Sequence, residues 1–148
     1  MRKLIGAVLL LAACKTAPVA TAPGPVSGPG AASPRDAVAG FLNAVTSQDL
    51  QAMSRYWGTA AGPVRDRGDM SRDELEKREL LMMCYLRHDK YRVVTESQDA
   101  SGHVLAVELR LGPLTRTTNF HAVVGPSSRW FVQSVDLDPV VDMCRSRG

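Results

Sequence analysis

The apolar residues of this 148-residue chain change their spacing once, near residue 89, and this change constrains the fold most strongly. Before it, apolar side chains recur at the helical spacing i, i+3, i+4 and i+7: Val38, Phe41, Leu42 and Val45. After it, apolar residues alternate with polar or small ones, as in a half-buried strand: Leu105, Val107, Leu109 and Leu111. Helices followed by strands predict an α+β domain with its helices on one face of a sheet.

Three capping residues divide the helical part into three segments: Ser33, Asp49 and Ser71. The first helix is expected to begin at Pro34, the second to end at Gly58 and the third to run to about His88. Glu74, three residues after Ser71, completes a capping-box pattern at the start of the third helix.

Four segments with strand character follow, separated by turn residues: 90–97, 103–112, 115–125 and 129–137. The loops at 99–102 and 125–128 are short and suit hairpins, which predicts an antiparallel meander. A last short helix is expected from Pro139. Residues 34–148 are therefore predicted to form one α+β domain, with N-terminal helices packed on a four-stranded antiparallel sheet.

The first 13 residues have the layout of an export signal. Arg2 and Lys3 precede an apolar run, and two small residues, Ala12 and Ala13, stand before Cys14. The apolar run is shorter than the roughly 20 residues that a membrane-spanning helix needs. An ordinary signal peptide, cut after an alanine and leaving Cys14 without a role, is the alternative.

Leu11-Ala12-Ala13-Cys14 resembles a bacterial lipobox. The resemblance implies that the Cys14 thiol is acylated, with palmitate or a similar chain, and that the leader is cut just before it. Several acyl chains would hold the protein at a membrane in the cell envelope. Lys15, where an aspartate would favour the inner membrane, implies the outer membrane facing the periplasm if the cell is Gram-negative.

Residues 14–33 join this anchor to the domain. After Lys15 the segment has no charged residue and is rich in Pro, Ala and Gly. Such a composition does not bury enough apolar surface to offset the entropy lost on ordering, so a disordered tether is expected.

The opening "SPRDAVAGFLNAVTSQDLQAMSRYWG" and the order of elements over about residues 33–137 resemble the nuclear-transport-factor-2-like cone. This superfamily includes ketosteroid-isomerase-like enzymes and small envelope lipoproteins. The resemblance implies a cone-like domain with a pocket between sheet and helices. Another helix-on-sheet domain, such as a cystatin-like one, is the second choice of fold.

The chain has three cysteines. If lipid takes Cys14, Cys84 and Cys144 remain as a pair, and an exported domain meets an oxidising compartment in many bacteria. A disulfide between them is predicted, with two free thiols as the alternative. Cys84 and His88 share a helix face, but two ligands do not make a metal site, so no metal and no cofactor is expected.

His121 and Asp136 are the best acid–base pair that the strands offer. Asp136 has the same parity as Trp130 and Val132, which would turn it toward the covered face of the sheet. The alternative is a solvated cross-strand pair. Three aromatic residues are candidates for lining a pocket, although core packing also explains them: Tyr56, Trp57 and Trp130.

The charge of the chain excludes one class of partner. The formal net charge is +3, and Arg2 and Lys3 of the leader supply two of these charges. A nearly neutral mature chain lacks the concentrated basic face that nucleic-acid binding needs.

The sequence therefore predicts a non-enzymatic envelope lipoprotein that binds a small apolar ligand or another envelope protein. The alternative is a small isomerase- or hydrolase-like enzyme using His121 and Asp136. A purely structural partner in an assembly is a third reading, and it predicts an apolar patch on the open face of the sheet.

Overall fold

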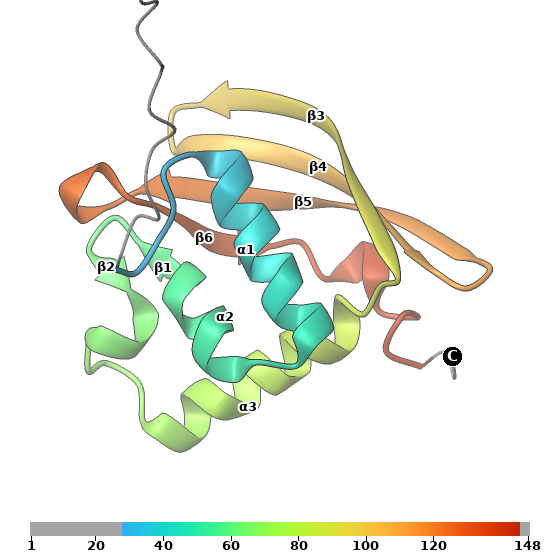
Figure 1. The fold of residues 1–148 in the computed structure, drawn as a ribbon, viewed down its shortest axis with the longest axis horizontal. Helices are drawn as coiled ribbons and strands as arrows, with labels where there is room; N and C mark the ends of the chain where they lie inside the picture. The colour runs from blue at the N-terminus through green and yellow to red at the C-terminus, as the bar shows by residue number, and fades with distance from the viewer. Residues whose placement is uncertain (1–27, 146–148) are drawn as a thin grey trace, which may run out of the picture.

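The computed structural model describes residues 28–145, which form a helical layer on one face of a sheet (Figure 1). The three helices are α1 (Pro34–Ser47), α2 (Leu50–Tyr56) and α3 (Arg72–Tyr85). The sheet follows in the antiparallel order β3-β4-β5-β6, with strands Lys90–Asp99, Gly102–Leu111, Leu114–Val124 and Trp130–Val135. The predicted α+β class and the order of its elements are confirmed. The predicted leader, Cys14 and most of the predicted tether lie outside the described residues.

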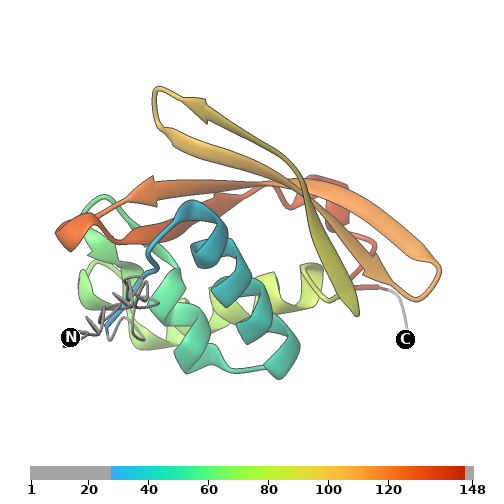
Figure 2. The same cartoon turned by 45° about the horizontal axis from the view of Figure 1, so that its top comes forward.

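Figure 2 shows the helices together on one side of the sheet, while the far end of the β3–β4 hairpin extends beyond them. A small hairpin of β1 (Gly58–Thr59) and β2 (Gly62–Pro63) lies between α2 and α3, followed by the 3-10 turn η1 (Val64–Asp66). Within residues 28–145, none of the helices is both long and apolar enough to cross a membrane.

The predicted caps start the three helices. Each cap side chain accepts a hydrogen bond from a backbone N–H three residues on: Ser33 from Asp36 at 3.1 Å, Asp49 from Ala52 at 2.9 Å and Ser71 from Glu74 at 3.2 Å. A cap of this kind contributes about 1 kcal/mol to helix stability. The third helix ends at Tyr85, three residues before the expected end at His88.

The core lies between α1 and the sheet. The α1 side chains that recur at helical spacing are buried, and they meet the apolar side chains of β4 and β5 that face the helices. Phe41 and Phe120 meet edge to face with ring centroids 6.2 Å apart, and both are fully buried. Packed side chains therefore fill the space beneath α1 around these two rings.

A β-bulge in β6 changes which way its residues point. Ala122 pairs with Val132 while His121 pairs with Ser134, so Gln133 is an extra residue on the β6 side. Because side chains alternate between the faces of a strand, one extra residue reverses the parity beyond it. Val132 is buried beneath the helices, whereas Ser134 faces solvent.

The ordered domain begins before residue 34, where the sequence analysis placed its boundary. Ala31 and Trp130 exchange two backbone hydrogen bonds of 2.9 Å, and the Gly30 N–H donates to the Arg55 carbonyl at 2.7 Å. Gly30 has a φ of +76°, and a Cβ there would lie 2.8 Å from the Phe131 ring. Residues 28–33, predicted to belong to the tether, therefore lie against β6 and α2.

The predicted C-terminal helix is a single 3-10 turn, η3 (Asp138–Val140), followed by turns to residue 145. Val140 and Met143 of this tail are fully buried in the core. Arg116 of β5 pairs with Asp142, which adds a polar contact between the tail and the sheet.

Candidate functional site: a pocket between α2 and α3

A pocket of about 560 Å³ lies between α2 and the first half of α3. On α3 its lining residues follow the spacing i, i+3, i+4 and i+7, which places them on one face of the helix: Arg72, Leu75, Glu76 and Glu79. The opposite wall comes from α2 and from the segment before α3: Leu50, Gln51, Ser54, Arg65 and Met70. Its volume falls in the range of small-molecule sites.

Glu79 is the most unusual residue of this pocket. Its side chain is on the pocket wall, and the residue is only 3% exposed. Its Oε1 has no hydrogen-bond partner, and it is the one such buried side-chain atom within residues 28–145. Buried polar groups are nearly always hydrogen-bonded, because an unsatisfied one costs about 1–3 kcal/mol.

Burial raises the pKa of Glu79 from 4.5 to about 7. The nearby charge of Arg65 opposes this shift and that of Glu76 adds to it. A carboxyl group with a pKa near 7 changes its charge around neutral pH, and such groups cluster at functional sites.

Arg65 supplies the positive charge opposite Glu79. Its Nη1 lies 3.5 Å from the hydroxyl of the buried Ser54, and its Nε lies 3.4 Å from Asp66. Both distances are long for hydrogen bonds. The guanidinium, with its five donors, therefore keeps donors for a further group in the pocket.

The sequence analysis did not single out Glu79, which stands in the charged run "RDELEKRE" of α3. Glu79 and Met83 are nevertheless the two buried residues of α3, and they are one helical turn apart. The available signal was that Glu79 stands between Leu75 and Met83 on one stripe of the helix, at a position where an apolar residue is expected.

His121 and Asp136 do come together, but on the open face of the sheet. His121 Nε2 lies 3.3 Å from Asp136 Oδ1, and the side chains are 32% and 48% exposed. Asn119 also donates to Asp136, at 3.0 Å. The expectation that Asp136 points toward the covered face is wrong, because the bulge at Gln133 turns it outward. The arrangement is that of a solvated cross-strand pair, and neither residue lines the pocket between α2 and α3.

The three aromatic candidates do not line this pocket either. Tyr56, Trp57 and Trp130 are partly buried and pack against the core. Trp130 meets His103 edge to face at 4.9 Å, and the backbone of Trp57 forms an isolated bridge with Val132. Trp57 therefore connects the end of α2 to β6, the edge strand of the sheet.

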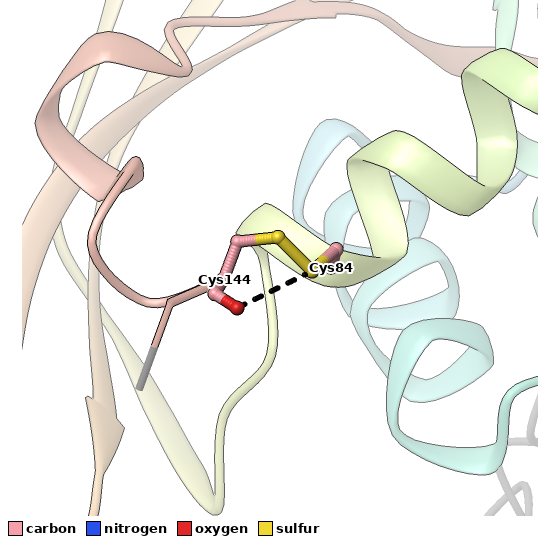
Figure 3. Close-up of a disulfide and its surroundings, with 2 residues drawn as sticks. All are labelled: Cys84 and Cys144. Atoms are coloured by element: carbon pink, nitrogen blue, oxygen red, sulfur yellow. Dashed lines mark hydrogen bonds between the residues drawn. A yellow bond between two sulfur atoms is a disulfide. The ribbon is translucent and has the colours of Figure 1, made fainter. Parts of the chain in front are cut away.

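The structure brings Cys84 and Cys144 together as a disulfide, with their Cα atoms 4.7 Å apart (Figure 3). Cys84 is in the last turn of α3, and its Sγ also lies 3.6 Å from the Cys144 carbonyl oxygen. The bond ties the tail, which contains the buried Met143, to the end of this helix.

His88 is engaged elsewhere and does not join Cys84. Its Nδ1 lies 2.8 Å from the Leu86 carbonyl oxygen and its Nε2 lies 3.1 Å from the Thr46 hydroxyl. Within residues 28–145, no three histidine, cysteine or acidic side chains cluster as a metal site would require.

The open face of the sheet is mainly polar along its central strand β5, whose outward residues are Thr115, Thr117, Asn119 and His121. The exposed large apolar residues of the described chain lie on α3 or singly on strands: Leu80, Leu81, Val94 and Val124. This distribution does not favour the reading of a purely structural partner with an apolar sheet face.

No protein-family model, no curated protein and no solved structure matches this chain. The geometry of the pocket is therefore the main guide to function.

Proposed function

We propose that this chain is a lipid-anchored envelope protein whose domain binds a small ligand, without catalysis, in the pocket between α2 and α3. The observation that carries the binding proposal is the buried Glu79 Oε1, which has no partner within residues 28–145. A ligand that donates a hydrogen bond there would satisfy an atom that is costly to leave unpaired.

The lining of the pocket supports a polar ligand rather than the apolar one expected from sequence. Six of its nine residues are polar or charged, and Leu50, Met70 and Leu75 supply the apolar part. The pocket lies between helices, whereas the resemblance to the nuclear-transport-factor-2-like cone implies one between helices and sheet. Helices followed by an antiparallel meander support that family as part of the proposal.

The anchoring half of the proposal is supported by the sequence Leu11-Ala12-Ala13-Cys14. We propose that Cys14 carries the lipid and that the domain faces the periplasm from the outer membrane in a Gram-negative cell. No nucleic-acid partner is proposed. Two of the three net positive charges belong to the leader, so the rest of the chain lacks the concentrated basic face that nucleic-acid binding needs.

The anchor is tested by expressing the full chain in a bacterium, separating membranes and measuring the mass of the mature protein. We expect membrane recovery and an acylated N-terminal cysteine. A Cys14→Ser variant is the control, and it should lose the lipid mass and leave the membrane. An unacylated mature protein that begins elsewhere would contradict the anchor.

Binding is tested separately with a set of small polar, charged and apolar fragments, followed by ligand-observed NMR on the purified full chain. Fragments that bind in the pocket by donating a hydrogen bond to Glu79 should lose their signal in the Glu79→Gln variant. Asp73→Asn is the matched control, since Asp73 is an exposed acid on the same helix and lies outside the pocket. If no fragment depends on Glu79, the pocket is not a binding site.

A further inference from the structure

We infer that the pocket between α2 and α3 binds a small zwitterion of the α-amino acid type, with its ammonium group on Glu79 and its carboxylate on Arg65. This inference rests on the proposed binding function and names the chemistry of the ligand.

The buried carboxyl group of Glu79 lacks a hydrogen-bond donor for its Oε1 within residues 28–145. The residue is 3% exposed, and no protein group of the described chain donates a hydrogen bond to its Oε1. An ammonium group brings both hydrogen-bond donors and the opposite charge, which a buried carboxylate needs.

The second step is the position of Arg65. It belongs to η1, on the wall that faces α3, and its charge reaches Glu79 strongly enough to affect the ionisation of that carboxyl group. Since its contacts with Ser54 and Asp66 are 3.5 and 3.4 Å long, its guanidinium is available for a bidentate bond with a carboxylate.

The third step is the balance of charge. Two arginines and two glutamates line the pocket: Arg65, Arg72, Glu76 and Glu79. A simple cation would meet the two arginines, and a simple anion would meet the two glutamates. A ligand with one charge of each sign is complementary to both, and such complementarity favours one partner over others.

The volume of the pocket also suits an amino acid. A pocket of about 560 Å³ has room for an amino acid with its side chain, and three apolar lining residues offer that side chain a surface: Leu50, Met70 and Leu75. We therefore expect aliphatic amino acids to bind better than glycine.

The test compares L-leucine with two analogues that each lack one charged group. Isopentylamine is leucine without the carboxylate, and 4-methylpentanoate is leucine without the amine. We expect leucine to bind the purified full chain at least about tenfold more tightly than either analogue, measured by NMR titration, because each loses one ion pair.

Two variants check the assignment of each charge. Glu79→Gln should weaken leucine at least about tenfold and leave 4-methylpentanoate unchanged or stronger, because the repelling charge is removed. Arg65→Gln should weaken leucine and leave isopentylamine unchanged or stronger. Asp73→Asn should change none of these affinities.

The inference is overturned if leucine binds no better than an analogue, or if none of the three compounds binds. In that case a neutral polar fragment that binds with Glu79 dependence would preserve the proposed binding function. If no fragment of any charge shows Glu79 dependence, the proposed function fails as well.

Discussion

Cys84 and Cys144 are 60 residues apart in the chain, and their disulfide joins the last turn of α3 to the C-terminal tail. Val140 and Met143 of the tail are buried in the core, so the disulfide holds in place a tail that contributes to the core. On the loop-entropy description, cross-linking a loop of this length stabilises a fold by up to about 4 kcal/mol.

We predict that reduction, or a double Cys84→Ser and Cys144→Ser substitution, lowers the free energy of unfolding by about 2–4 kcal/mol. Urea denaturation of the oxidised and reduced protein measures the difference. Mass analysis of the native protein should show no alkylatable thiol at Cys84 or Cys144. Two reactive thiols there would show that the pair is not bonded in solution.

The raised pKa of Glu79 predicts how the free energy of unfolding depends on pH. Its folded-state pKa of about 7 lies above its ordinary value of 4.5, so the unfolded chain releases this proton first as the pH rises. The contribution of Glu79 to stability is therefore present below pH 4.5 and is lost progressively up to about pH 7. The total loss is about 3 kcal/mol or less.

The Glu79→Gln variant should not show this loss, because an amide does not ionise. Its stability relative to the natural protein should rise by up to about 3 kcal/mol between pH 4 and pH 8, as measured by urea denaturation at each pH. Asp73→Asn is again the control and should follow the natural protein. A constant difference between Glu79→Gln and the natural protein across this range would refute the assignment.

Two glycines at positive φ should differ in their tolerance of a side chain. Gly102 has a φ of +147°, and a Cβ there would lie under 3.0 Å from the Ala122 carbonyl oxygen, which is backbone and does not move aside easily. Gly112 has a φ of +52° and open space around it. We expect Gly102→Ala to cost about 2–3 kcal/mol or more, and Gly112→Ala about 1 kcal/mol. Thermal or urea unfolding of both variants checks the order, and equal costs would contradict it.

The His121–Asp136 pair should contribute little. Since both side chains are partly exposed on the open face, their interaction should stabilise the fold by about 1 kcal/mol or less. His121→Ala and Asp136→Asn should unfold close to the natural protein and bind the fragments of the pocket unchanged. A large loss of binding in either variant would contradict this prediction and would favour the alternative that His121 and Asp136 belong to a functional site.

Much of the fold could be predicted from the sequence because its signals are local. Ser33, Asp49 and Ser71 cap helices through hydrogen bonds that span three residues, and the alternation of β4 follows from the pleat of a single strand. The Cys84–Cys144 pair followed from counting the cysteines under the expectation that lipid modifies Cys14. In each case the necessary groups are close in the chain or few in number.

The direction of the Asp136 side chain could not be predicted from the sequence. Parity along β6 pointed it inward, but Gln133 is an extra residue in the register with β5 and reverses the direction. A bulge depends on how two strands pair, and a single strand does not contain that information.

The burial of Glu79 is the second feature that the sequence did not predict. Among the charges of α3 Glu79 resembles a solvated residue, and it is buried only because α2 and the segment around Arg65 pack over that face of the helix. Local spacing therefore determined the elements of this protein, their order and their starting residues. Packing between distant segments decided which acid is buried, which is exposed and where the pocket lies, because burial depends on neighbours that the chain brings together only when it folds.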